Sequence, residues 1–198
     1  KTYLNPLLSI IVDFVFPYNG YIGGQKLNRY IKTHIKSKNI EELALPLTIT
    51  AVRTRTGQLE YFQRGLLADR IQASCSIPNV FRPVLIDGVE YLDGDLCSPV
   101  PIKKAREEHQ DSVILAVDII PQAHDAPRNN LKWAKEISRT IYRQTLVANE
   151  KVYADLFLNP VLGYGVKFSK KDSEKRIELG YQQTRALIPK LKQILASV

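Results

Sequence analysis

The stretch that decides the fold runs over Arg70–Pro101 and reads RIQASCSIPNVFRPVLIDGVEYLDGDLCSPVP. It contains two short apolar segments, Pro83–Ile86 and Val89–Leu92, which are separated by Asp87-Gly88. An Asp-Gly pair between two apolar segments is a strong short-range signal of a β-hairpin. The residues before the hairpin end a helix and turn sharply at Ile77-Pro78. The sequence therefore predicts a helix, a tight turn and a hairpin in immediate succession.

An acidic group directly follows the second strand of this hairpin. Asp93-Gly94-Asp95 leaves the strand and enters a proline-rich loop. A carboxylate at the end of a strand, beside a glycine that lets the backbone turn, is a common way to direct an acid into a cleft. Two carboxylates in one neighbourhood also change each other's pKa, which makes Asp95 relevant to Asp93. The simpler interpretation of Asp95 is a loop acid that accepts backbone N–H bonds.

The same residues resemble a known family. The helix ending in ASCSIP, the hairpin, the Asp93-Gly94 dipeptide and the PVPI that opens the next helix closely resemble the second half of a bacterial patatin-like phospholipase domain. In that family the aspartate of a D-G-[G/A] motif and the serine of a G-x-S-x-G motif form a Ser-Asp dyad that hydrolyses acyl esters. The resemblance implies that Asp93 is the catalytic general base, supported by Gly94, Asp95 and Pro78. Asp95 departs from the small residue that is usual at its position.

The nucleophile that this resemblance requires is not in the sequence. No G-x-S-x-G motif occurs among the 198 residues. Ser74 and Ser76 are near Asp93 in sequence, but neither has the glycines that a strand-to-helix nucleophile elbow needs, so we interpret both as capping or loop-bonding residues. The resemblance implies that the glycine-rich oxyanion loop and the serine elbow precede Lys1. We therefore expect a single patatin-like domain over 1–198 that lacks its N-terminal strand–helix–strand unit.

The hydrophobic pattern predicts further elements on both sides of the central stretch. Helices are expected at 25–35, 65–75, 102–109 and 131–152, strands at 47–54, 59–62, 112–119 and 153–159, and a last helix that Asp172 or Ser173 would cap and Pro189 would kink or restart. The tract 4–16 fits either a helix or a strand, and 17–24, 121–130 and 160–165 are typical of loops.

The order of these elements indicates the fold class. The continuous apolar run at 112–119 is typical of a strand buried on both faces, and helices flank it. Such a strand–helix–strand order favours an α/β protein. We expect a three-layer α/β/α domain with a mainly parallel central sheet, as in the patatin-like family.

Composition is that of an ordinary soluble globular protein, with 44% hydrophobic and 24% charged residues. No run approaches the roughly 18 apolar residues of a membrane span. The net charge of +8 lies mainly outside residues 46–130. A basic surface attracts anionic lipid or nucleic acid, although its simpler interpretation is a solvated helix face.

The partners follow from this charge and from the resemblance. No basic cluster with interleaved aromatic residues is present, and single-strand binding would need one. We therefore expect no nucleic acid partner. The expected partners are an acyl-ester or phospholipid substrate and, at its periphery, an anionic membrane, with a cytoplasmic or membrane-peripheral location.

The cysteines and histidines give no sign of a metal site. Cys75 and Cys97 flank the central hairpin, and two cysteines do not make a disulfide-rich scaffold, so we expect reduced, buried thiols. His34, His109 and His124 are isolated, and none has a second ligand at metal-binding spacing. We therefore expect no metal and no cofactor.

Three interpretations of Asp93 remain open from the sequence. The chain can belong to a lipid acyl hydrolase whose serine lies outside the 198 residues, which is the interpretation that we favour. It can instead be a non-catalytic lipid-binding or scaffold protein of the same fold. In the third, Asp93 is structural and caps a helix start at 99–105, where the helix dipole favours an acid.

Overall fold

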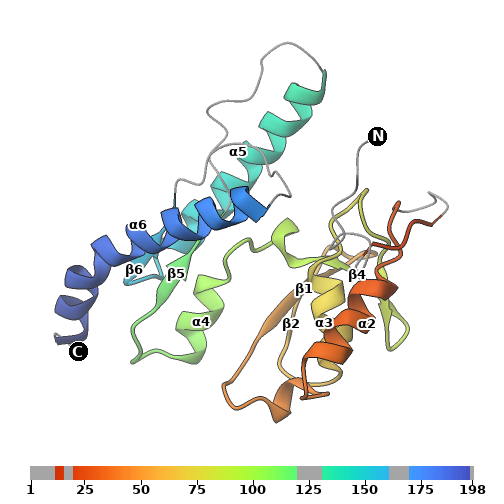
Figure 1. Ribbon diagram of the computed structural model, residues 1–198, viewed down its shortest axis with the longest axis horizontal. Coiled ribbons are helices and arrows are strands. Elements are labelled where there is room, and N and C mark those ends of the chain that lie inside the picture. Colours follow the sequence, from red (N-terminus) through yellow and green to blue (C-terminus); the bar gives the residue numbers. More distant parts are fainter. Residues whose placement is uncertain (1–11, 16–19, 120–130, 161–169, 197–198) are drawn as a thin grey trace. The chain divides into compact units, whose positions relative to one another are not determined.

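The computed structural model describes residues 12–15, 20–119, 131–160 and 170–196, with the backbone alone for 131–136 and 170. The chain divides into two compact units, Lys1–Ser98 and Pro99–Val198 (Figure 1). The sequence-based predictions for 4–11, 16–19, 121–130 and 161–165 lie outside the described residues.

The first unit holds a four-stranded sheet and two α-helices. Its elements in chain order are α2 (Gln25–His34), η1 (Ile40–Glu42), β1 (Ile49–Arg53), β2 (Leu59–Phe62), α3 (Leu67–Ser74), β3 (Val84–Ile86), β4 (Val89–Asp93) and η2 (Gly94–Leu96). The strand order in the sheet is β2-β1-β4-β3, and all three neighbouring pairs are antiparallel. The two hairpins and helices α2 and α3 agree with the elements that the sequence predicts.

Turn chemistry explains the hairpin of β3 and β4. Asp87 and Gly88 join these strands with φ angles of 50° and 80°. Two central residues with positive φ match the right-handed twist of the flanking strands, and Asp-Gly adopts this conformation readily. The hairpin thereby fixes the register of β4 and the place where Asp93 leaves the sheet.

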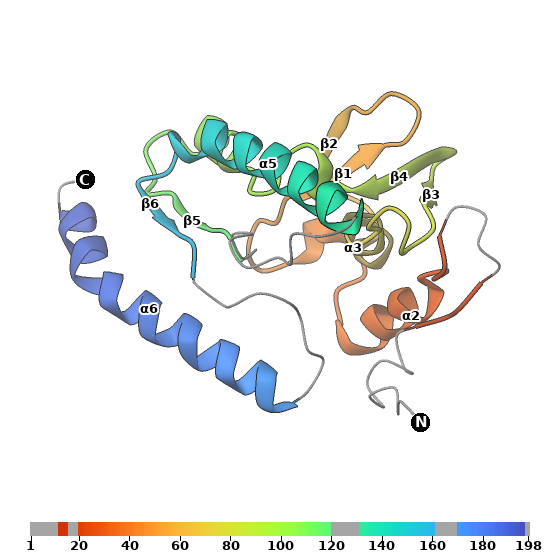
Figure 2. The same ribbon diagram turned by 90° about the horizontal axis from the view of Figure 1, so that it is seen from above.

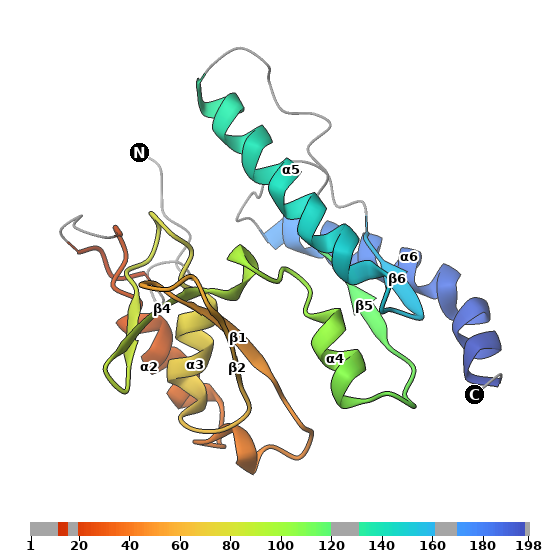
Figure 3. The ribbon, with the colours of Figure 1, turned by 180° about the vertical axis from the view of Figure 1, so that it is seen from behind.

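Helix α3 lies against the sheet, and α2 lies beside α3 (Figure 3). The core between them is formed by buried apolar side chains from both hairpins, η1 and α3. Its described members are Ile40, Ile49, Ala51, Phe62, Leu67, Ala73, Val84, Ile86 and Tyr91. Phe62 and Tyr91 meet edge to face with ring centroids 5.2 Å apart, an arrangement that aromatic pairs prefer.

The second unit contains α4 (Ile102–Glu108), β5 (Leu115–Val117), α5 (Leu131–Lys151), β6 (Leu156–Leu158) and α6 (Lys170–Ala196). Strands β5 and β6 run side by side and parallel (Figure 2). Since α5 lies between them in the chain, β5, α5 and β6 form the predicted strand–helix–strand unit.

Charged contacts hold this unit together. The two terminal guanidinium nitrogens of Arg143 on α5, Nη1 and Nη2, donate to the Asp118 carboxylate after β5, at 3.1 and 2.8 Å. Arg106 on α4 pairs with Asp155 and also donates to the carbonyl oxygens of Gln110 and Ser112. These bonds connect helices α4 and α5 to the ends of the parallel strands.

The expectation of a mainly parallel sheet is not confirmed. In the described residues the larger sheet is antiparallel, and only β5 and β6 are parallel. For β1–β2 and β3–β4 the reason is local, because strands joined by tight turns can pair only antiparallel. The strand expected at 112–119 is also shorter, and it is buried on one face only: Ala116 is buried, whereas Leu115 and Val117 are 47% and 44% exposed.

The last helix also differs from expectation. Helix α6 continues from Lys170 to Ala196 with Pro189 inside it, so the proline does not restart the helix, and a kink at this residue stays a prediction. Asp172 lies in the first turn and accepts a hydrogen bond from Arg176 at 2.9 Å. Within the described part of the chain, no helix has the length and apolar character needed to cross a bilayer.

Candidate active site

Asp93 is the last residue of β4, and its backbone is fixed on two sides, by β1 of the sheet and by the turn after α3. It lies opposite Ala51 on β1, and its amide donates to the Ser76 carbonyl oxygen at 3.0 Å. The residue is half-buried. A carboxylate is thus held at the end of a strand, as the sequence predicts, and beside the turn that follows α3.

The Asp93 side chain is oriented by its own loop. Its Oδ1 accepts the Asp95 amide at 2.9 Å and so caps η2. Helix α4 instead begins after Pro101, without a side-chain cap. The interpretation of Asp93 as the cap of the helix near 99–105 is therefore wrong, because the aspartate bonds to the turn directly after it.

Gly94 allows this loop to lie against β1. It is buried, and a β-carbon at this position would lie 2.7 Å from the Thr50 carbonyl oxygen. Its own carbonyl oxygen accepts the amides of Cys97 and Ser98, both at 3.0 Å. Glycine is thus required here for space, and no local sequence signal identifies Thr50 as the neighbour.

The turn after α3 supports the Asp93 backbone. Ser76 is 1% exposed, and its hydroxyl donates to the Gln72 carbonyl oxygen at 2.7 Å, as expected of a loop-bonding residue. A buried hydroxyl bonded in this way is poorly placed to attack a substrate. Pro78 starts the next turn, in which Asn79 has a φ of 64° and the Val80 amide donates to Ile77.

Cys75 is a neighbour of Asp93 that sequence reasoning missed. It is free and exposed, which corrects the expectation of a buried thiol. Partial desolvation, together with the negative charge of Asp93, raises the pKa of the Cys75 thiol. The thiol therefore lies within electrostatic reach of Asp93. Cys97 is also free and partly exposed, and desolvation raises the pKa of its thiol.

A segment distant in sequence borders the same turn. The Tyr21 and Ile22 amides donate to the Val80 carbonyl oxygen at 3.0 and 2.9 Å. Asp13 accepts the Gly24 amide at 2.9 Å and the Gln25 amide at 3.1 Å, and thereby caps α2. These contacts tie the start of α2 to the turn that supports Asp93.

The chemistry available at this site is that of an oriented carboxylate. In the described ranges, no three His, Cys, Asp or Glu side chains gather as metal ligands. A carboxylate that is held by one backbone N–H can accept a proton from a nucleophile brought close to it. The geometry is thus suited to a base.

Comparison with known proteins gives the family of this chain. The model of the patatin-like phospholipase family matches residues 2–106, which is more than half of the chain and includes Asp93 and the turn before it. The chain therefore belongs to the patatin-like phospholipase family, and this confirms the resemblance seen in the sequence. An α/β fold at the level of the family is consistent with the helices and sheets described above.

Individual relatives are more distant. The chain is 32% identical over 83 residues to an uncharacterized NTE family protein of Mycobacterium bovis, covering 42% of this chain and 23% of that protein. It is 22% identical over 126 residues to Lysophospholipase NTE1 of Cryptococcus neoformans, covering 64% of this chain and 8% of the relative. The corresponding Candida albicans protein is 22% identical over 116 residues. The match spans less than a quarter of the length of each of these relatives.

Proposed function

We propose that this chain carries the general base of a lipid acyl hydrolase that works through a Ser-Asp dyad. Asp93 is the base, and the serine lies outside the 198 residues. The observation that carries the proposal is the fixed Asp93 carboxylate at the end of β4, inside the region that matches the family. The substrate class is an acyl ester of a phospholipid or lysophospholipid, in keeping with the name of the fungal relatives.

The proposed roles follow from the contacts. A serine hydroxyl is a poor nucleophile until a neighbouring base accepts its proton, and in a dyad the aspartate does this directly. The Asp95 amide orients one oxygen of Asp93, while the Ser76 carbonyl oxygen holds the Asp93 amide. Gly94 and Pro78 support the two turns. Backbone donors for the oxyanion, each worth about 3 kcal/mol, would come with the serine segment.

The fold and the surroundings belong to the same proposal. We propose one patatin-like domain of three α/β/α layers, to which the parallel pair of β5 and β6 contributes. The expected partners are the lipid substrate and an anionic membrane contacted at its periphery. No nucleic acid partner is proposed.

A second candidate is a non-catalytic lipid-binding or scaffold protein of the same family. The observation in its favour is that no G-x-S-x-G motif occurs among the 198 residues. This candidate shares the fold and the lipid, but it requires no reaction.

An intact-mass spectrum of the protein purified from its native source, with and without a fluorophosphonate probe, tests the two candidates. A chain heavier than 22.5 kDa that gains one probe supports the hydrolase, and peptide mapping then locates the serine. A chain of about 22.5 kDa that gains none overturns the hydrolase and leaves the lipid-binding protein.

A further inference from the structure

A surface of unit 1 is strongly basic. The segment 25–39, QKLNRYIKTHIKSKN, comprises α2 and the loop that follows it, and it contains no carboxylate. Its cations are Lys26, Arg29, Lys32, Lys36 and Lys38. So many like charges in so short a segment produce a local positive potential that attracts anions.

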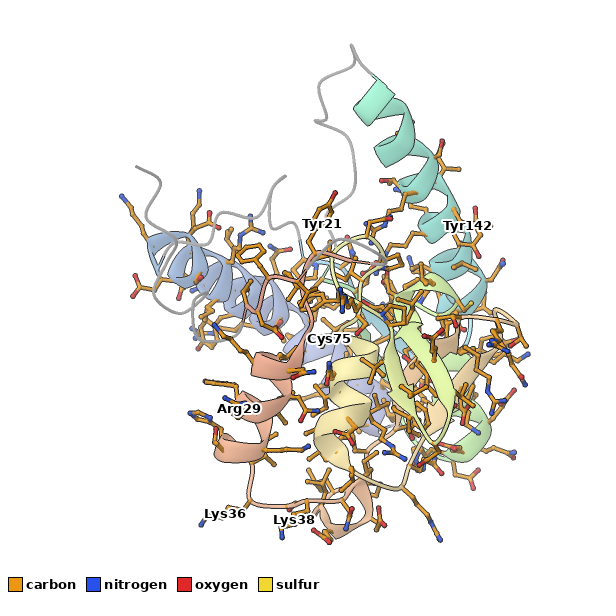
Figure 4. The ribbon with its side chains drawn as sticks, turned by 90° about the vertical axis from the view of Figure 1, so that its right-hand side faces the viewer. Tyr21, Arg29, Lys36, Lys38, Cys75 and Tyr142 are labelled. Atoms are coloured by element: carbon orange, nitrogen blue, oxygen red, sulfur yellow. The ribbon has the colours of Figure 1, made fainter. Side chains whose placement is uncertain are left out.

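One side of α2 is directed inward. Ile31 is buried and Leu27 is half-buried, while Asn28 donates to Asp69 on α3 at 2.8 Å. Arg29 lies on the other side of the helix. Figure 4 shows the Arg29, Lys36 and Lys38 side chains projecting away from α3.

The nearby carboxylates are engaged on the inner side or with the backbone. Asp69 pairs with Lys32 at 3.4 Å. Both oxygens of Asp13 accept amides at the start of α2. Glu42 accepts the Lys38 and Asn39 amides at 2.9 and 3.2 Å. Arg29 and Lys36 have no carboxylate partner among the described residues, so their charge faces solvent.

Amphipathic side chains lie among these cations. Tyr30 stacks on His34 with ring centroids 3.9 Å apart, and both residues are exposed. Ile35, directly after the end of α2, is also exposed. Tyr21, a few residues before the start of α2, is exposed as well. Tyrosine and aliphatic groups next to lysine and arginine suit the boundary between lipid headgroups and acyl chains.

We propose that the outward side of α2 and the loop 35–39, here called the α2 surface, binds the anionic headgroups of a membrane. This proposal rests on the proposed function, because a lipid hydrolase must reach a substrate that lies in a bilayer. The α2 surface is in the same unit as Asp93, and the start of α2 is bonded to the turn that supports Asp93. Headgroups bound there would hold the membrane close to the site.

The α2 surface fits this role better than the basic helix α6. Helix α6 carries seven cations along 27 residues, but three carboxylates are interspersed with them, and Asp172 pairs with Arg176. The α2 segment concentrates five cations in 15 residues without a carboxylate. Helix α6 therefore provides a matched control.

The test is co-sedimentation of the full chain with phosphatidylcholine vesicles, with and without phosphatidylserine. The double variant Arg29→Glu/Lys36→Glu is compared with Arg185→Glu/Lys192→Glu on α6, which changes the net charge equally. We expect the wild type to bind phosphatidylserine vesicles and to lose binding with added salt. The α2 variant should lose about tenfold in binding or more, and the α6 variant should lose less than about twofold.

Other outcomes overturn the proposal. Equal loss in the two variants, or no preference for phosphatidylserine, removes the α2 surface as the membrane contact. Tighter binding to a DNA duplex than to vesicles, lost in the same α2 variant, assigns the surface to nucleic acid instead. Circular dichroism and thermal melting show whether the exposed substitutions leave the fold intact.

The vesicle assay needs no turnover, so it separates this proposal from the proposed function. A protein that binds vesicles through α2 but takes no fluorophosphonate supports the α2 surface and overturns the hydrolase. A protein that reacts with the probe but shows no preference for phosphatidylserine vesicles supports the hydrolase and overturns the α2 surface as the membrane contact.

Discussion

The two units of this chain differ in how many apolar side chains they bury. Unit 1 encloses a cluster of buried apolar side chains between an antiparallel sheet and α3. Unit 2 has two short parallel strands and buries fewer described apolar residues. These residues are Ile102, Ala116, Val147, Leu156 and Leu158. No described side chain of α6 is buried. Two strands alone are marginal in water, whereas several strands with an apolar face form a stable core. The candidate site therefore lies in the unit with the firmer packing.

The largest expected effect is the loss of turnover when Asp93, in unit 1, is replaced. Asp93→Asn should lower kcat by about 100- to 10,000-fold, because it removes the proton acceptor but keeps an oxygen for the Asp95 amide. Phospholipid hydrolysis by the native-source protein and its variants measures this, with thermal melting alongside. Asp155→Asn in unit 2 is the matched control and should leave kcat within about twofold. If Asp93→Asn lowers only the amount of folded protein, the residue is structural.

The next effect is a difference between the two units in the free energy of unfolding that a truncated apolar side chain costs. Phe62→Ala removes a ring that is 8% exposed, and it should cost about 3–5 kcal/mol of unfolding free energy. Ile177→Ala on α6, where the side chain is 72% exposed, should change it by less than about 0.5 kcal/mol. Urea denaturation measures both. Similar costs at the two positions would mean that the exposed face of α6 is covered in solution.

A smaller effect concerns acid stability in unit 2. The Ile114 amide at 2.7 Å, together with the Arg106 guanidinium, lowers the pKa of Asp155 below its usual 3.8. A carboxyl whose pKa is lowered by folding stabilises the protein above its unfolded pKa. That contribution is lost as the pH falls through the folded pKa. We expect Asp155→Asn to cost less than about 1 kcal/mol at pH 7, owing to solvent screening, and to cost progressively less as the pH is lowered from about 4 towards about 2. Melting curves across that range check it, and a cost that is independent of pH would contradict it.

The smallest effect reports directly on the neighbourhood of Asp93. Its negative charge helps to raise the pKa of the Cys75 thiol, so Asp93→Asn should lower that pKa and increase the thiolate fraction. Alkylation of Cys75 by iodoacetamide at pH 8 should then become a few-fold faster. Cys97, whose pKa is raised by desolvation, is the internal control and should keep its rate. Unchanged labelling of Cys75 would show that the thiol lies outside the field of Asp93.

The same contrast explains what could be predicted from the sequence. The hairpin of β3 and β4 was predictable because Asp87-Gly88 encodes its turn locally, and α3 follows from local apolar spacing. The position of Asp93 at a strand end follows from the same local signals. The strand–helix–strand order of unit 2 was likewise visible in the sequence.

The supporting contacts of the site could not be predicted in this way. The pairing of β1 with β4, the cap that Asp13 forms on α2, and the approach of Thr50 to Gly94 all join residues far apart in the chain. Periodicity and turn chemistry carry no information about such contacts. The exposure of Cys75 is of the same kind, since it depends on which elements happen to cover the end of α3.

The close approach at Gly94 also has a consequence for how freely this protein can vary. In a library of all single substitutions, position 94 should accept no other residue, because even a methyl group would displace Thr50 and with it β1. At Gly88, a β-carbon would meet nothing within 4 Å, and the positive φ there is tolerated by asparagine or aspartate. Two glycines six positions apart should therefore evolve at very different rates, one held by its neighbours and the other only by its own backbone.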